Sequence, residues 1–545
     1  MRNFFINKIK KYLAFFLKIL NYPSTIKYKY HRKKANKTLN ELFNNIFFRK
    51  KNSNYIICEG LWDNPHHWLR LSIFGPVLAN YLNSNLMGIY LKGTNKSVVR
   101  TINTFNFSKY IELECTIKKR HYEKAKSYYL KLRSNKDIFN LSLPYDYPGQ
   151  FLYDSILKGE MIGTISYKDK VIEKYIAKLI CFLEEYEKIF DNQKIKALII
   201  SHPVSIRFST LACIALKKNI PVYVMNYLNE YISLRKLNNL EDWENGAYEK
   251  PLLSHIKKLP KTKKNHLEKV GSEYLKQVRL AKRGEVSSVG AFNQETNFVF
   301  SKKKFLKNLN LDSLKPTGVI MTGCWPDFPN IYPPTWYLDY VDWFEQTLEI
   351  IKGIKNANWI IKPHPAEFKY GAKTKMIHFA KNINEENIVI WPKDLPANYI
   401  NEIADVLITS HGTSGIEYPA QGKPVIISKK THFEEWGFVN YCATFSEYKK
   451  SLSNLNLIKK PTKSSKKLAN IYLATFLCNG SNIEKKYLFD LGSKSQKLWT
   501  SITNFININQ KNISYEQDMM KKWLESDIQS YNFFKSINYT DWGNK

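Results

Sequence analysis

Residues 408–428 read Ile-Thr-Ser-His-Gly-Thr-Ser-Gly-Ile-Glu-Tyr-Pro-Ala-Gln-Gly-Lys-Pro-Val-Ile-Ile-Ser. This pattern predicts a strand, a Gly/Thr/Ser turn, a short helix stopped by Gly422, and a second strand. Backbone N–H groups at such a turn have no acceptor within the helix, so they suit a phosphate, and Glu417 can reach a ribose hydroxyl attached to it. The candidate phosphate ligands are His411, Gly412, Thr413, Ser414 and Gly415. The alternative interpretation is an ordinary glycine-rich loop.

A second segment, Asn358-Trp-Ile-Ile-Lys-Pro-His-Pro365, predicts a strand that ends abruptly at two prolines. His364 is therefore expected at the carboxyl end of a strand, the edge where open α/β sheets bind ligands. Beside Lys362, it can donate a hydrogen bond to a phosphate oxygen as negative charge builds there. A histidine that only satisfies a hydrogen bond in the core is the alternative.

The composition predicts a globular protein with an anionic partner or working surface. The chain has 545 residues and is 44% hydrophobic, enough for two domains with full cores. Lys and Arg number 83 against 48 Asp and Glu, a formal net charge of +35, although the abundance of Lys, Asn and Ile can also reflect genomic composition. The seven cysteines are scattered without a Cys-x-x-Cys pair, which argues against a disulfide framework or a zinc site and indicates a reducing compartment.

The N-terminus predicts a helix that lies on a membrane without crossing it. Residues 1–20 place an apolar stripe beside lysines and lack a small-residue cleavage site, and the basic segment 27–37 follows. Such a pattern fits an anionic bilayer surface. The alternative is a basic helix packed on its own domain.

Strand-like and helical patterns alternate in two series. Strands are expected at 55–58, 86–91, 110–113, 197–200, 222–225, 317–322, 358–361, 388–390, 405–409 and 425–428. Helices are expected at 66–82, 121–133, 171–190, 205–218, 266–282 and 337–351. This is the logic of βαβ units, so two Rossmann-like halves follow.

These patterns predict four regions. They are a basic amphipathic segment at 1–45, an acceptor domain at 46–310 with an insert at 227–300, a nucleotide-donor domain at 311–445, and a helical segment at 446–545. The sequence has no Asp-x-Asp pair, which a transferase that holds a diphosphate through a metal usually needs.

The two halves, the His-Pro at a strand end and the Gly-Thr-Ser turn together resemble the metal-independent GT-B glycosyltransferases of bacterial capsule and surface polysaccharide synthesis. The similarity is strongest to the capsule-synthesis group that includes the Kdo transferases, and weaker to sialyltransferases and CDP-glycerol polymer transferases. It extends from Thr317 to about Tyr441 and is only general in the first half. The implied fold is α/β, with two Rossmann-like domains facing a cleft.

The resemblance also implies residue roles. His364 contacts the donor phosphate and helps the nucleotide leave, and Thr413 and Ser414 contact the same phosphate. The acid that precedes a glycine after the first strand corresponds to Glu59, with Asp63 as its substitute for the general base. His202, at the end of the 197–200 strand, is a further candidate base. A simpler role for Glu59 is to cap the helix that begins near Pro65.

The implied partners are a nucleotide-sugar donor, CMP-Kdo-like or another, and an oligosaccharide or lipid-linked acceptor, with no cofactor and no metal. The expected location is cytoplasmic, peripheral on the inner face of the cytoplasmic membrane. A related alternative is a polyol-phosphate transferase that uses CDP-glycerol or CDP-ribitol. A different class, a basic nucleic-acid-binding protein, is suggested by the charge alone, without a recognisable nucleic-acid motif.

Overall fold

The structure is a computed structural model. It describes residues 22–538 apart from 46, 48–49, 63–64, 95, 106, 227–231, 247–249, 283–291, 293–300, 368–370, 394, 479–495 and 509. The predicted apolar stripe in residues 1–20 and the predicted base Asp63 lie outside the described residues.

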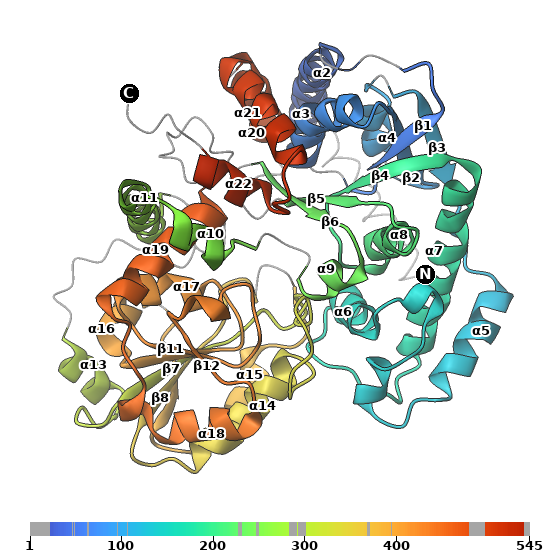
Figure 1. The fold of residues 1–545 in the computed structure, drawn as a ribbon. Coiled ribbons are helices and arrows are strands. Elements are labelled where there is room, and N and C mark those ends of the chain that lie inside the picture. The colour runs from blue at the N-terminus through green and yellow to red at the C-terminus, as the bar shows by residue number, and fades with distance from the viewer. Residues whose placement is uncertain are drawn as a thin grey trace.

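The first domain is built on a six-stranded sheet with the order β3-β2-β1-β4-β5-β6 (Figure 1). Its strands are β1 (Asn54–Glu59), β2 (Asn85–Leu91), β3 (Lys109–Leu113), β4 (Lys194–Ile200), β5 (Val222–Asn226) and β6 (Ser233–Leu237). All neighbours are parallel except β5 and β6. This is the 3-2-1-4-5-6 order of a Rossmann domain.

The second domain repeats the same order with every neighbouring pair parallel. Its sheet runs β12-β11-β10-β7-β8-β9. The strands are β7 (Thr317–Met321), β8 (Asn358–Lys362), β9 (Ile388–Ile390), β10 (Val406–Thr409), β11 (Val425–Ile427) and β12 (Asn440–Tyr441). The predicted α/β fold with two Rossmann-like domains is confirmed.

Helices cover both faces of each sheet. Those of the first half are α2 (Tyr22–Asn44), α3 (Pro65–Tyr81), α4 (Lys96–Ile102), α5 (Lys119–Tyr129), α6 (Gly149–Glu160), α7 (Val171–Asn192), α8 (Ile206–Lys217), α9 (Leu240–Glu244), α10 (Leu253–Lys258) and α11 (Lys261–Arg279). The second half adds α13 (Lys302–Asn308), α14 (Tyr340–Lys352), α15 (Met376–Ala380), α16 (Ile400–Ile403), α17 (Ser414–Glu417), α18 (Phe445–Ser453) and α19 (Lys463–Leu477). The last are α20 (Gln496–Ile508), α21 (Gln510–Leu524) and α22 (Tyr531–Asn538).

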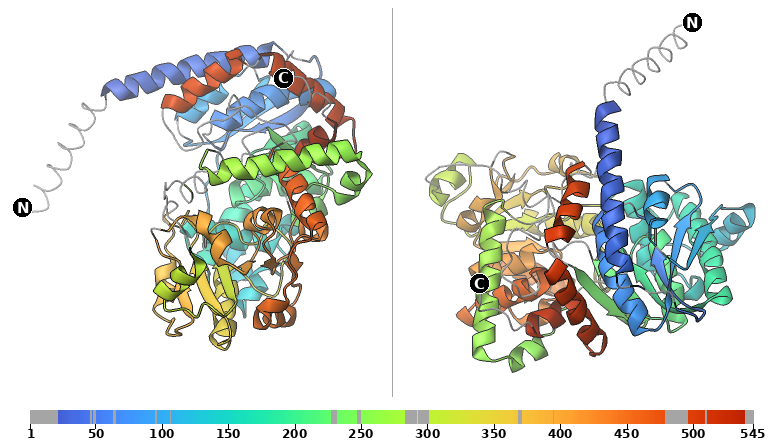
Figure 2. Two further views of the ribbon diagram at one scale, coloured as in Figure 1. Left: turned by 90° about the vertical axis from the view of Figure 1, so that its left-hand side faces the viewer. Right: turned by 90° about the horizontal axis from the view of Figure 1, so that it is seen from above.

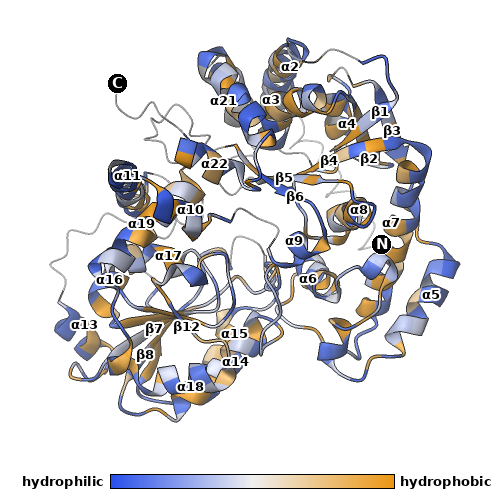
Figure 3. Ribbon diagram, in the orientation of Figure 1, coloured by the Kyte–Doolittle hydropathy of each residue, from blue (hydrophilic) through white to orange (hydrophobic). Residues whose placement is uncertain are grey.

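The strands are apolar on both faces because helices bury both, as parallel sheets require. In β1, Ile57 packs with α6, α7 and α8, whereas Ile56 packs toward α2, α3 and α4. Figure 3 shows the same contrast, with hydrophobic strands inside and a largely hydrophilic α11 outside. None of the helices within the described residues is long and apolar enough to cross a membrane.

The C-terminal helices return to the first domain. After α19 packs against α11 and α17, α20 lies against α2 and α21 against α3 (Figure 2). The hydroxyl of Tyr81 donates to the carbonyl of Leu524 over 3.0 Å. One continuous apolar cluster therefore joins α2, α11, α19 and the last helices.

On the opposite side, α6 and the loop after it join the first domain to the second. Tyr153 Oη donates to Asp339 Oδ2 over 2.5 Å, and Asn330 donates to both oxygens of Asp154 over 2.8 and 2.9 Å. The N–H of Gly163 donates to Thr374 Oγ1 over 2.9 Å. The domains are therefore held together by polar contacts here.

Candidate functional site

His364 stands on a short, constrained loop at the carboxyl end of β8. Its N–H donates to Thr322 Oγ1 over 3.1 Å, and its ring Nδ1 accepts from the N–H of Ala366 over 3.1 Å. Because Nδ1 is the acceptor, Nε2 carries the hydrogen in the neutral ring. Burial lowers the pKa of His364 to about 4, while nearby Asp327 acts in the opposite direction. At neutral pH this histidine is therefore an uncharged donor, with no hydrogen bond from Nε2 inside the described structure.

Lys362 is the last residue of β8 and lies half-buried beside the ring of Trp391, with its ammonium 5.7 Å from the ring centre. Burial lowers its pKa to about 8, and no described carboxylate pairs with it. A desolvated cation without a counter-ion favours an anion nearby. Lys362 and His364 thus offer a charge and a donor at one sheet edge.

The 408–428 stretch folds as predicted. β10 leads through a turn into α17, a 3-10 turn ends at Gly422 with φ +87°, and β11 follows. The N–H groups of Gly415 and Ile416 donate to the carbonyls of Gly412 and Thr413, so those of Thr413 and Ser414 have no acceptor within the helix. Thr413 is exposed and Ser414 partly so. These two residues remain candidate phosphate ligands.

Gly412 is partly exposed beside Thr413, whereas Gly415 and His411 are engaged in packing and hydrogen bonds. Gly415 is buried, and a Cβ there would lie 2.8 Å from the ring of Phe433, so its glycine identity serves close packing. His411 is hydrogen-bonded through both ring nitrogens, to Tyr340 Oη at 3.1 Å and Ser410 Oγ at 2.9 Å. Burial lowers the pKa of His411 well below its usual value. His411 is therefore held in place by Tyr340 and Ser410, and it fixes the start of the turn.

Glu417 is the last residue of α17 and lies near Arg279, the last residue of α11. Burial raises its pKa, and a hydrogen bond from Thr413 and the charge of Arg279 lower it. Arg279 also lies over the ring of Tyr418, with its guanidinium carbon 5.9 Å from the ring centre. Whether Glu417 contacts a ribose stays a prediction.

Glu59, the predicted base, ends β1 with no exposed surface. Its carboxylate accepts from the N–H of Leu61 over 2.8 Å, from the N–H of Ser201 over 3.1 Å, and from the Ser201 hydroxyl. The ring of His67 lies 3.6 Å away. The carboxylate therefore joins the loop after β1 to the loop after β4, and a cap on the α3 backbone stays a prediction.

His202 follows directly on the loop that Glu59 holds. Its ring contacts Trp62 and Phe208, with ring centres 4.9 and 5.6 Å apart. Burial lowers the pKa of His202 to about 3, and the charges of Arg207, His67 and Lys158 lower it further. At neutral pH the ring is uncharged, the form a proton acceptor needs.

An ion pair across the two domains lies within electrostatic range of both histidines. Lys158, in the last turn of α6, contacts Asp327 Oδ1 over 2.6 Å. The charge of Lys158 acts on His202, and that of Asp327 acts on His364. Candidate residues of both domains are therefore gathered around this pair.

Lys158 and Asp327 are not among the site residues predicted from the sequence. Asp327 follows Gly-Cys-Trp-Pro after β7, so its place at the carboxyl end of a strand was an available signal. Lys158 carries no comparable signal, because the helix that presents it was not predicted.

Behind the ion pair is a fully buried network of charged groups. Lys429 Nζ donates to Asn330 Oδ1 over 2.8 Å, and Asn330 in turn binds Asp154. Burial lowers the pKa of Lys429 to about 8 and raises those of Asp154 and Asp339 to about 7 and about 6. The network fixes α6 against the second domain.

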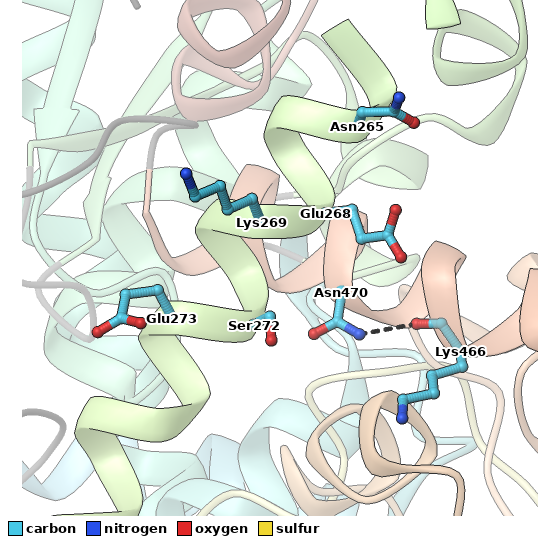
Figure 4. A pocket seen from close by; sticks show the side chains of 7 residues that line it. All are labelled: Asn265, Glu268, Lys269, Ser272, Glu273, Lys466 and Asn470. Carbon is cyan, nitrogen blue, oxygen red and sulfur yellow. Dashed lines mark hydrogen bonds between the residues drawn. The ribbon is translucent and has the colours of Figure 1, made fainter. Parts of the chain in front are cut away.

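A groove of about 360 Å³ lies elsewhere, between α11 and α19 (Figure 4). It is lined by Asn265, Glu268, Lys269, Ser272, Glu273, Lys466 and Asn470. None of the predicted site residues lines it. Over the described part of the chain, no three His, Cys, Asp or Glu side chains are grouped to hold a metal ion.

Comparison of the sequence with protein families gave no match, and comparison with curated proteins gave none. Among solved structures, the chain is similar to the beta Kdo 2,4 transferase KpsC of Thermosulfurimonas dismutans, with 12% identity, a TM-score of 0.30, and coverage of 53% of this chain and 85% of that one. It is similar to UDP-GlcNAc 2-epimerase of Neisseria meningitidis, with 12% identity, a TM-score of 0.23, and coverage of 84% and 100%. It is also similar to the ADP-heptose lps heptosyltransferase II of E. coli, with 10% identity, a TM-score of 0.24, and coverage of 74% and 99%. These are distant similarities of fold.

Proposed function

We propose that this chain is a glycosyltransferase that moves a sugar from a nucleotide donor to a growing capsule or other surface polysaccharide. The observation that carries the proposal is the state of His364. Its Nδ1 accepts from the N–H of Ala366, so its neutral ring presents an Nε2–H within electrostatic range of the ammonium of Lys362. This pair is suited to the phosphate of a leaving nucleotide.

In the proposed reaction, an acceptor hydroxyl attacks the anomeric carbon as the bond from that carbon to the phosphate oxygen breaks. Lys362, His364 and the N–H groups of Thr413 and Ser414 offset the charge that develops on the phosphate. The proton of the acceptor hydroxyl passes to the first domain, where His202 and Asp63 are the candidate bases. We assign Glu59 the task of holding the two loops that carry them, and we expect the reaction to need no metal.

The proposed location is the anionic surface of the cytoplasmic membrane, and α2 supports it. The side chains of Lys29, Lys33, Lys34 and Lys37 are exposed, while Ala35, Leu39 and Phe43 on the other face pack in the core. Basic residues arranged in this way favour an anionic lipid surface. The described part of this segment is thus a packed helix with a basic outer face.

A transfer assay tests the function. The full chain is incubated with CMP-, UDP- and GDP-sugars and with CDP-glycerol, with and without a chelator, and release of the nucleotide is measured. We expect turnover with one sugar nucleotide, little effect of the chelator, and a loss of about 100- to 1000-fold in His364→Ala. Near-normal activity of that variant, or activity with CDP-glycerol alone, contradicts the proposal.

A further inference from the structure

The face of α6 that meets the second domain carries Asp154 and Lys158, which are four residues apart and therefore lie on one side of the helix. Asp154 is fully buried and accepts two hydrogen bonds from Asn330. One turn further on, Lys158 is only partly covered, with 30% of its side chain exposed. The anchored turn therefore holds Lys158 at the edge of the contact between the two domains, called the joint below, where the side chain meets solvent.

The partner of Lys158 stands on a strained loop. Asp327 precedes Phe328, whose φ of +51° is rare for a residue other than glycine. The ammonium of Lys158 also lies 5.6 Å from the centre of the Phe328 ring. Such strain persists only when surrounding contacts enforce it, and it gathers at ligand sites.

Cationic or hydrogen-bond-donating side chains of both domains approach this loop. Asp327 lies on the loop after β7, and Thr322 at the start of that loop accepts from the N–H of His364 over 3.1 Å, so the ion pair brings Lys158 toward the same place from the first domain. Lys362 and the Nε2–H of His364 approach it from the second. Asp327 is 41% exposed and is the carboxylate in direct contact with Lys158.

We propose that Lys158 is a ligand of the donor phosphate supplied by the first domain. Asp327 holds the Lys158 ammonium at the site and competes with the phosphate for it. The proposal rests on the proposed function. It makes donor binding depend on the joint, because the phosphate then contacts both domains at once.

The competition gives the two members of the pair opposite effects. Replacing Lys158 removes a cation from the phosphate, and a charged hydrogen bond of this kind typically accounts for about 10- to 100-fold in affinity. Replacing Asp327 with Asn removes a competing negative charge, so the affinity for phosphate should rise. A pair that only braces the domains would give losses in both variants.

The test is calorimetric titration of CMP, UDP and GDP, with cytidine, uridine and guanosine as probes without phosphate, into the full chain and its variants. We expect Lys158→Ala to weaken binding of the nucleotide about 10- to 100-fold without affecting the nucleoside, and Asp327→Asn to strengthen nucleotide binding. Lys218→Ala is the matched control, since Lys218 is 33% exposed and pairs with Asp191 inside the first domain at 2.9 Å.

Equal losses in Lys158→Ala and Asp327→Asn, or an affinity within about twofold of the wild type in Lys158→Ala, overturn the role of Lys158. If the role of Lys158 fails in this way but His364→Ala weakens nucleotide binding in the same titrations, the proposed function stands without Lys158. If the wild type binds none of the three nucleotides, both proposals fail together.

Discussion

The hydroxyl of Tyr153 in α6 donates a hydrogen bond to the carboxylate of Asp339, at the start of α14, over 2.5 Å. Both side chains are fully buried. Burial raises the pKa of Asp339 to about 6. A hydroxyl of one domain thus donates to a carboxylate that caps a helix in the other. Loss of that single oxygen atom should therefore weaken the contact between the domains.

Tyr153→Phe should destabilise the protein by about 1–3 kcal/mol, because it leaves a buried carboxylate oxygen without this donor. Unfolding in urea measures the change. Tyr122→Phe, at a side chain that is 41% exposed, is the control and should have little effect. Equal stabilities of the two variants would show that the bond does not hold the joint.

Glu59→Gln should lower both stability and activity. The carboxylate accepts from two backbone N–H groups and a hydroxyl, and the amide nitrogen of Gln would face one of these donors. A loss of about 1–3 kcal/mol in the free energy of unfolding is expected. Glu123→Gln, at an exposed side chain, is the control. If Glu59→Gln unfolds like the wild type yet is inactive, Glu59 is the base after all.

The affinity for a nucleotide should fall as the pH rises through about 8. Burial lowers the pKa of Lys362 to about 8, so above that value the ammonium loses its proton and its attraction for phosphate. Binding measured from about pH 7 to pH 9.5 tests this dependence. Lys362→Arg keeps its charge over the range and should give a flatter profile. Parallel profiles would remove Lys362 from the site.

Replacing Lys29, Lys33, Lys34 and Lys37 with Glu should release the protein from anionic liposomes. Each basic residue near such a surface contributes about 1 kcal/mol. Activity on a short soluble acceptor and thermal stability should be retained, because the buried face of α2 is unchanged. Undiminished sedimentation with liposomes in low salt would place the attachment elsewhere. Deleting residues 1–37 is a poor substitute, since it also removes buried Arg32 and Ala35.

The fold could be predicted because buried parallel strands appear as short apolar runs between helical patterns, and β1, β8 and β11 lie where such runs occur. β6 was not predicted. Its Arg235 and Lys236 interrupt the apolar pattern, and it pairs antiparallel at the edge of the sheet. α6 is not among the predicted helices either. Its residues Asp154 and Lys158 meet the second domain only when the domains pack, so the sequence does not show these contacts.

The candidate site, like the fold, could be predicted only where local sequence marks it. Lys362 and His364 could be found because two prolines mark a strand end locally. Ser201 is 142 residues from Glu59 and Asp327 is 169 residues from Lys158, so no local pattern shows that Glu59 joins two loops or that Lys158 meets Asp327. Contacts of that range form only through the packing of the sheets and domains.

The most direct test of the central claim is thermal unfolding of the wild type and His364→Ala with CMP, CDP, UDP and GDP in turn. A nucleotide at about 100 times its dissociation constant should stabilise the wild type by about 2.7 kcal/mol. We expect at least one of the four to raise the melting temperature of the wild type, and His364→Ala to require a higher concentration for the same shift. No shift with any of the four would contradict it.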